Sequence, residues 1–393
     1  MEPTSTAAAT TLFLVGVALL LVSDDGDVID CVDMYQQPAL KDVPGHKMQT
    51  IMKPTRSMKE IIASSGIATR TQGLHQTWRK RGSCPAGTVP IRRPSTNADP
   101  AAAERARRAF SSGHSHYSNQ SATINDCPGN NITGILEVAA AYGTNGPYLG
   151  ARAIVELWNL DVHPEELYMH YIMVAYTLDP GYTPGPSVDP PQNLTNQIIV
   201  GLVNDGGLNN NCFNLDCGGF HLVNSSHTVG SLWRGGISEP GGDKFGVTFG
   251  IHRTKNNCNL QEILGDPTNL VWWVSVMDEE IGYYPESLFR TRFQEVSYVE
   301  LGGRVVDRRP GGKHTKTPMG SGMLVCGGSH FAGTIIEYQG VGANGEFFLD
   351  SVDRTVVTTP FCYNAQPVGF GIDRPGYYVA YGGPGGTSCD TYS

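Results

Sequence analysis

Residues 281–307 read IGYYPESLFRTRFQEVSYVELGGRVVD and contain the clearest strand signal of the chain. We interpret residues 294–301 within this stretch as a β-strand, in which successive side chains alternate between the two faces. Alternation places three side chains on one face: Val296, Tyr298 and Glu300. Two glycines follow, Gly302 and Gly303, and glycine lets another backbone or a ligand approach a strand closely. The stretch therefore predicts a strand with a carboxyl group on one of its faces.

The environment of Glu300 determines its chemistry. A carboxyl group buried beside Tyr298 would have a raised pKa, and a raised pKa makes glutamate a usable acid or base in an enzyme. The alternative is a glutamate on an edge strand that faces water. Spacing alone leaves both hypotheses open.

Working outward, the rest of residues 130–393 shows many short strand patterns separated by Gly, Asn, Asp and Pro. The 48 glycines and 25 prolines, with few helix-periodic stretches, also favour a loop-rich β protein. We predict a mostly β fold, with the strands arranged as an antiparallel sandwich or barrel. A short helix is expected over residues 285–289. The predicted strands, besides that at 294–301, cover 151–158, 171–176, 197–203, 219–223, 245–253, 270–277, 300–306, 333–338 and 377–381.

Composition and the N-terminal segment bear on partners and location. The formal charge of −9 argues against a nucleic-acid or anionic-membrane partner. Residues 7–22 form an uncharged apolar run that is short for a membrane span and long enough for a signal peptide. We predict a signal peptide over residues 1–23 and a secreted, extracellular protein. A short N-terminal anchor is the alternative.

The chain divides further by composition. Residues 24–93 predict a small mixed prosegment with short strands, in which Trp78 is the packing anchor. Residues 94–129 change to a polar linker of the kind that processing proteases cut, and an inert linker is the alternative. The prosegment is expected to contact the rest of its own chain and to cover the groove face of the β domain at 130–393.

The nine cysteines of a secreted chain point to disulfides. Cys31 with Cys84 would close the prosegment on itself. The odd count leaves at least one free or intermolecular thiol among Cys127, Cys258 and Cys326. We expect no metal and no cofactor, because the sequence has no C-x-x-C or H-E-x-x-H motif. Four N-x-[ST] sequons are candidate glycan sites: Asn119, Asn131, Asn193 and Asn224.

Several ordered motifs together resemble the plant neprosin family of secreted glutamic peptidases that cut after proline. The matching segments are G-Y-Y-P at 282–285, V-E-L-G-G-R-V at 299–305, D-C-V-D-M-Y-Q-Q-P at 30–38, Q-T-W at 76–78, C-P-A-G-T-V-P-I-R-R at 84–93, Y-L-G-A-R-A at 148–153, W-N at 158–159, C-F-N-L-D-C at 212–217, M-G-S-G at 319–322 and Y-G-G-P-G at 381–385. They extend over most of the chain.

This resemblance implies a β-sandwich and a catalytic pair of glutamates, one of them at Glu300. It also implies two disulfides, Cys212–Cys217 and Cys362–Cys389. Tyr284 and Tyr298 could line a pocket for a substrate proline, and core packing explains them equally well. The expected partners are proline-containing peptides or proteins.

The first glutamate of the pair is missing. The family motif that carries it should lie between Tyr176 and Gln192, where residues 177–191 read TLDPGYTPGPSVDPP. This proline-rich run cannot pair as a central strand, so the strand beneath the motif could be lost as well. Asp179 or Asp189 could substitute for the glutamate, and a gene model that lacks an exon edge would also explain the departure.

Two hypotheses follow from the missing glutamate. The first is a secreted proline-directed endopeptidase that is impaired or inactive. The second is a non-catalytic β-sandwich that binds proline-rich or cell-wall polymers.

Overall fold

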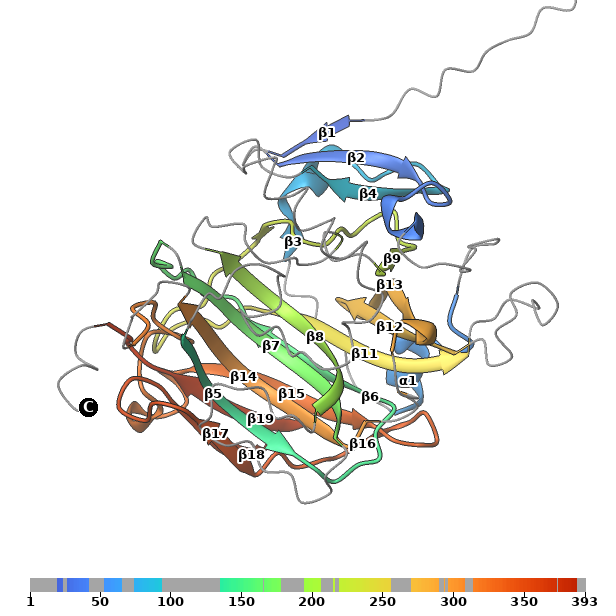
Figure 1. The fold of residues 1–393 in the computed structure, drawn as a ribbon. Coiled ribbons are helices and arrows are strands. Elements are labelled where there is room, and N and C mark those ends of the chain that lie inside the picture. The colour runs from blue at the N-terminus through green and yellow to red at the C-terminus, as the bar shows by residue number, and fades with distance from the viewer. Residues whose placement is uncertain are drawn as a thin grey trace, which may run out of the picture.

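The computed structural model describes residues 20–23, 27–41, 53–65, 74–93, 135–164, 166–177, 194–205, 215, 219–255, 270–289, 293, 296–307, 314–372 and 374–386. Antiparallel β-sheets dominate the architecture (Figure 1). Residues from 135 onward build two sheets that pack face to face, and a small three-stranded sheet from the preceding region lies at one end of them. The mostly β fold predicted from the sequence is confirmed.

The first sheet of the sandwich has five strands, all antiparallel to their neighbours. Their spatial order is β17 (Arg354–Val357), β5 (Ile135–Gly143), β14 (Tyr298–Asp307), β7 (Glu166–Thr177) and β8 (Leu194–Asp205). Strands β7 and β8 pair along nearly their full lengths, so the strands on both sides of residues 178–193 are present. Residues 178–193 themselves lie outside the described residues, so the loss of a strand beneath the missing motif stays a prediction.

The second sheet has nine strands. Their order is β18 (Asn364–Phe370), β19 (Tyr377–Gly382), β15 (Gly333–Val341), β6 (Gly150–Glu156), β11 (Gly246–Lys255), β12 (Leu270–Val276), β13 (Glu279–Pro285) and β9 (His221–Leu222), with β16 (Phe347–Phe348) paired to β15. Short 3-10 turns follow β13 at Glu286–Leu288 and precede β15 at Val325–Gly327. The turn after β13 agrees with the short helix predicted after Pro285.

The hydrophobic core lies between the two sheets. Alternate residues of β14 face it, such as Val299 and Leu301, and they pack with Ala151 and Val155 from β6 of the opposite sheet. The other residues of β14 face outward, where they form a second cluster with outward residues of β5 and β7. This period-two pattern is what the sequence stretch at 294–301 predicted for β14, with one exception described below.

Strand β5 was not predicted, although every other long strand of the sandwich except β18 and β13 was. Its centre is Val138-Ala139-Ala140-Ala141, and alanine has a low intrinsic preference for strands. The tertiary fit explains the strand, because a Cβ at Gly302 of β14 would lie only 2.5 Å from the Ala140 Cα. Small residues on both strands allow this close pairing. The backbone approach predicted for Gly302 is thus made by β5.

The region before residue 94 has its own small sheet, in the order β1 (Leu20–Val22), β2 (Val28–Asp33) and β4 (Thr88–Arg92). The predicted Cys31–Cys84 disulfide is present, and Trp78 is fully buried beside it. Leu20–Val22 belongs to the predicted signal peptide, yet in this structure it pairs with β2. No helix in the described part of the chain is long and apolar enough to cross a membrane.

This activation region, as we call residues 20–93 from here on, is hydrogen-bonded to the nine-stranded sheet and its loops. Strand β3 (His75–Gln76) pairs with β10 (Trp233–Arg234). Gln37 both donates to the Leu222 carbonyl and accepts from its N–H. Helix α1 (Met58–Ser64) begins with a capping box between Ser57 and Glu60, and it lies against the same sheet. The prosegment therefore contacts its own chain, as predicted.

The described contacts of this region lie on the nine-stranded sheet and not on the face that carries Glu300. The hydrogen bonds and ion pairs of the activation region reach the nine-stranded sheet and its loops. Glu300 lies on the outer face of the other sheet. The reason is where its partners lie: β10 pairs with β3, Leu222 of β9 binds Gln37, and the carboxylates of β13 face α1.

Removing the Cys31–Cys84 disulfide should loosen the activation region. The bond spans 53 residues of sequence, and closing a loop of that length stabilises a fold by about 4 kcal/mol in the chain-entropy model. We expect the double variant Cys31→Ala, Cys84→Ala to lose protection of β2 and β4 in amide hydrogen exchange. Cys326→Ala is the control, because Cys326 is an exposed free cysteine. Equal protection in both variants would contradict the prediction.

Candidate functional site

Glu300 lies on β14, the central strand of the five-stranded sheet, and its side chain is on the outer face. Pairing places Tyr142 of β5 and Met173 of β7 directly opposite it. The side chain is only 3 % exposed. The hypothesis of a water-facing glutamate on an edge strand was therefore wrong, because β14 has a partner strand on each side.

Three side chains bind the Glu300 carboxylate. The Tyr171 hydroxyl and Arg304 Nη2 both donate to Oε1, with the arginine at 2.7 Å, and the Tyr298 hydroxyl donates to Oε2. Arg304 Nε also donates to the Tyr171 hydroxyl oxygen at 2.7 Å, and its guanidinium lies 4.6 Å from the centre of that ring. The result is a closed, charge-compensated network in a buried position.

The sequence contained a signal for this network that we did not use. Strand alternation puts residues 300 and 304 on the same face, so Arg304 was a predictable neighbour of Glu300. Tyr171 comes from β7, and only the register between β7 and β14 brings it to the carboxylate. Tyr142 stacks on Tyr298 with ring centres 5.4 Å apart and completes the aromatic surroundings.

One side chain of the opening stretch was assigned to the wrong face. Val296 packs in the core between the sheets, whereas Tyr298 and Glu300 face outward. The regular strand begins only at Tyr298, and Val296 instead forms an isolated bridge with Tyr148. The chain changes direction at Ser297, so alternation does not extend across it.

A second carboxyl group near Glu300 is what paired acid–base chemistry requires. The outer-face positions around it on β5, β7 and β14 are described, and none is acidic; they are Ala140, Tyr142, Tyr171, Met173, Ala175, Tyr298 and Gly302. Asp179 and Asp189, the candidate substitutes, lie outside the described residues. Their role stays a prediction, as does the catalytic role of Glu300.

Two other buried carboxylates of this sheet point elsewhere. Glu137 accepts hydrogen bonds from Thr359 and from the backbone N–H of Thr315, and Glu166 accepts from the N–H groups of Lys316 and Thr317. These bonds fasten residues 314–317 to the edge of the sandwich. Sequence analysis missed both glutamates, because nothing local distinguishes such an anchor from a surface glutamate.

Tyr284 and Tyr298 do not share a pocket. Tyr284 lies on β13 in the nine-stranded sheet and packs on Phe220 with ring centres 4.8 Å apart. Tyr298 lies on the outer face of the other sheet. Burial raises the pKa of the Tyr284 hydroxyl to about 12, which is typical of a packed tyrosine. The hypothesis of core packing therefore explains Tyr284 better than a substrate pocket does.

One cluster has the composition of a metal site: Glu137, His314 and Cys362, whose ligand atoms lie within 4.8 Å of one another. Cys362 is disulfide-bonded, so its sulfur is not a thiolate. Glu137 Oε1 already accepts hydrogen bonds from Thr359 and from the His314 ring. The cluster does not fit a metal ion, because the ligands are committed to other bonds.

The remaining predicted sites are only partly described. The disulfide at Cys362 agrees with one family pairing, but its expected partner Cys389 lies outside the described residues, as do Cys212, Cys217, Cys127 and Cys258. Of the sequons, Asn224 alone is described. It is half-buried, and its Nδ2 donates to the Glu280 carbonyl at 3.1 Å. Glycosylation stays a prediction at all four positions: Asn119, Asn131, Asn193 and Asn224.

Two family models match this chain. One, described as Neprosin, matches residues 184–384, which include β14 and Glu300. The other, described as Neprosin activation peptide, matches residues 20–133, which include the whole activation region. The first match alone covers slightly more than half of the 393 residues.

Proposed function

Because this chain belongs to the neprosin family, we propose that it is a member with little or no peptidase activity, which binds proline-containing chains without cutting them. The observation that supports this proposal is the occupied carboxylate of Glu300. A general base needs a free lone pair to hold a water molecule and accept its proton. Here Arg304, Tyr171 and Tyr298 fill three of the carboxylate's about four acceptor positions, including both of those on Oε1.

The missing partner acid supports the same proposal. Residues 177–191 contain no glutamate, and the described outer-face neighbours of Glu300 are not acidic. The alternative is an impaired peptidase that cuts after proline, in which Asp179 or Asp189 supplies the acid. Loss of one acid–base partner costs about 10²–10⁴ in rate, so even this alternative predicts weak cleavage.

Binding without cutting would use the outer face of the five-stranded sheet. Tyr142, Tyr171 and Tyr298 gather there, and tyrosine rings stack well on the apolar faces of proline. In the full chain these rings are at most 4 % exposed, so binding requires a rearrangement that uncovers them. Proline-rich proteins or cell-wall chains are the proposed ligands.

We further propose that the protein is secreted and works outside the cell. The apolar run at residues 7–22 and the four sequons support this location. The Cys31–Cys84 disulfide also supports it, because structural disulfides form in oxidising compartments. Mass spectrometry of extracellular protein should find an N-terminus near residue 24 and glycan on at least one sequon.

Peptide hydrolysis tests the proposed function directly. The full chain, both intact and cut within residues 94–129, is incubated with a proline-containing peptide between about pH 3 and about pH 7. We expect no cleavage above the rate of the matched Glu300→Gln variant, because most acceptor positions of the wild-type carboxylate are filled and no acidic side chain lies beside it among the described residues. The same peptide, carrying a fluorophore, should still bind to the cut chain.

Two results would contradict this proposal. Post-proline cleavage that disappears in Glu300→Gln would show that a substitute acid exists, and Asp179→Asn and Asp189→Asn would then identify it. If the peptide is neither cut nor bound, the proposal that the protein binds proline-containing chains is wrong. Tyr142→Ala is the binding control, because it removes one ring of the stacked pair without touching the carboxylate.

A further inference from the structure

Segment 53–65 of the activation region lies on the outer face of the nine-stranded sheet, where Met58, Ile61 and Ile62 are buried and three glutamates bind polar groups of the segment. Three contacts share this character: the Met58 N–H donates to Glu280, Lys59 Nζ lies 2.8 Å from Glu279 Oε1, and Arg56 Nη2 lies 2.7 Å from Glu346 Oε1. The segment thus presents a positive charge at two positions, three residues apart, to three carboxylates of the sheet.

The floor beneath the segment is polar. Strand register places Arg152, Gly250, Ser275 and Glu280 in one row across β6, β11, β12 and β13. Met58 covers this row at Gly250, where a Cβ would lie 2.6 Å from the Met58 Cε. A methionine side chain offers almost no hydrogen bonding, so it leaves the polar floor beneath it unsatisfied.

Several buried polar atoms of this floor have no hydrogen-bond partner in the described part of the chain. They are Ser275 Oγ, Arg152 Nη1 and both ring nitrogens of His252, and each of these residues is 1 % exposed. Glu280 Oε1 is 3.8 Å from His252 Nε2, and the Arg56 backbone faces the ring. Ser275 Oγ and Arg152 Nη1 have no such neighbour among the described residues, and a buried donor left unpaired destabilises a fold. Met58 is therefore a poor chemical match for this floor.

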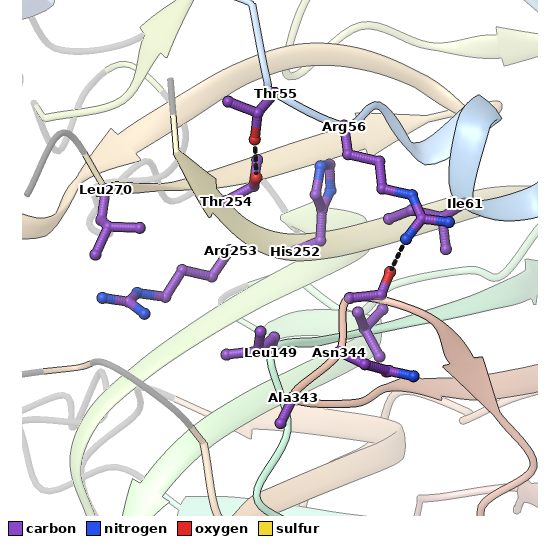
Figure 2. Close-up of a pocket in the computed structure, with 12 residues that line it drawn as sticks. Thr55, Arg56, Ile61, Leu149, His252, Arg253, Thr254, Leu270, Ala343 and Asn344 are labelled. Atoms are coloured by element: carbon purple, nitrogen blue, oxygen red, sulfur yellow. Dashed lines mark hydrogen bonds between the residues drawn. The ribbon is translucent and has the colours of Figure 1, made fainter. Parts of the chain in front are cut away.

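A cavity of about 310 Å³ lies beside the same floor, between the segment and the sheet. His252 lines it from β11, and Figure 2 shows its ring pointing toward Arg56. Thr55 and Thr254 contribute hydroxyl groups, and Ile61 and Leu149 contribute apolar walls. This cavity, between the segment and the sheet, would accommodate a larger side chain or additional backbone.

We propose that this surface, which we call the latch face (Glu279, Glu280, Glu346, His252 and Ser275), binds basic peptide segments of other proteins once segment 53–65 has left it. The ligand class is a peptide with an arginine and a lysine three residues apart and a side chain between them that can hydrogen-bond. This proposal goes beyond the proposed function, because it requires neither cleavage nor the Glu300 face.

Charge is the main argument for a basic ligand. When segment 53–65 leaves, Glu279 loses Lys59 and Glu346 loses Arg56, so their carboxylates face solvent without these cations. A basic peptide replaces both ion pairs. Its backbone carbonyls can also accept from Ser275 Oγ and Arg152 Nη1, which Met58 leaves unpaired. The net charge of −9 favours approach of such a ligand from any side.

The test uses the full chain with Arg56→Glu and Lys59→Glu, which places like charges against the latch face and opens it. The probe is a fluorescent peptide of residues 53–65 with the natural sequence. We expect the opened chain to bind this peptide at least about tenfold more tightly than the wild-type chain, whose latch face is occupied. Binding should weaken at high salt, because the pairs are partly exposed.

Two matched controls make the result specific. A peptide with the same two charge reversals should not bind, and Glu279→Gln with Glu280→Gln in the opened chain should abolish binding of the natural peptide. Met58→Gly is a second opening variant, for the case that the charge reversals prevent folding. The proposal is overturned if neither opened chain binds better than wild type, or if the charge-reversed peptide binds equally well.

Discussion

Lowering the pH from about 6.5 to about 4 is expected to destabilise this protein severely, because three buried histidines must stay neutral in the fold. Burial lowers the pKa of His170 to about 3, and it lowers the pKa of His227 and of His252 to about 4, from 6.5. In this pH range the unfolded chain takes up the three protons and the folded chain does not. Each proton costs about 1.4 kcal/mol per pH unit, so the full slope is about 4 kcal/mol per unit.

The surroundings of these histidines predict that acid unfolding proceeds in two stages. His252 faces Glu280 and the Arg56 backbone, while His227 faces Glu279, Arg79 and Lys59. Both therefore lie where the activation region contacts the sheet, and detachment of that region relieves them. Glu280 partly offsets the effect, because burial raises the pKa of its carboxyl and favours the protonated form in acid.

His170 belongs to the second stage. It lies between the two sheets, where its Nδ1 is hydrogen-bonded to the hydroxyls of Tyr168 on β7 and Tyr381 on β19. Opening the sandwich is the way to give its ring access to water. We therefore expect the activation region to detach at a higher pH than that at which the sandwich unfolds.

Urea unfolding between about pH 7 and about pH 4, followed by hydrogen exchange of β2 and β7, measures both stages. His252→Gln removes one titrating group at the contact with the activation region, so it should lower the slope of the first stage by about 1.4 kcal/mol per pH unit. His163→Gln is the control, because His163 lies at the surface. A stability that stays constant over this range would contradict the prediction.

Replacing Arg304 with methionine should produce the largest loss at constant pH. The guanidinium is the counter-charge of the Glu300 carboxylate in a buried position, with side-chain exposures of 12 % and 4 %. Removing one partner of a buried pair leaves an uncompensated charge and typically costs about 3–5 kcal/mol. We expect the free energy of unfolding at neutral pH to fall by about that amount.

The double variant Arg304→Met, Glu300→Gln separates the lost charge pair from the lost packing. It should recover much of the stability, because the uncharged glutamine can accept from one of the two tyrosine hydroxyls and donate its Nε2–H to the oxygen of the other. Arg93→Met is the matched control, since Arg93 pairs with Asp30 in solvent and its loss should be far smaller. Equal losses in Arg304→Met and Arg93→Met would show that the pair at Glu300 is not an energetic unit.

Much of the sandwich could be predicted from local patterns. All the strands predicted in residues 130–393 are present, because apolar alternation between turn residues reports which face of a strand is buried. Strand β5 was not predicted, since alanine has a low intrinsic preference for strands and here fits one because the glycines of β14 let the two strands approach closely. The Cys31–Cys84 disulfide could be predicted because both cysteines lie in one small region of an oxidised chain.

The site was less predictable than the fold. Glu300 could be placed on a strand from its neighbours, and Arg304 could have been placed beside it. Two features depend on contacts between residues more than a hundred positions apart: the register that brings Tyr171 to the carboxylate, and the location of α1 against Glu279 and Glu280. Such contacts cannot be predicted from local sequence.

The sequence by itself thus determined the β-rich fold, the disulfide-closed activation region and the family, because each depends on residue types at short spacing. Only the tertiary structure decided what Glu300 can do. The chemistry of a carboxylate is set by what its oxygens touch. Tyr298 and Arg304 come from the same strand as Glu300, and the tertiary structure adds Tyr171 through the pairing of β14 with β7. It also decided which sheet the activation region covers, since this depends on where free hydrogen-bonding edges and carboxylates come together.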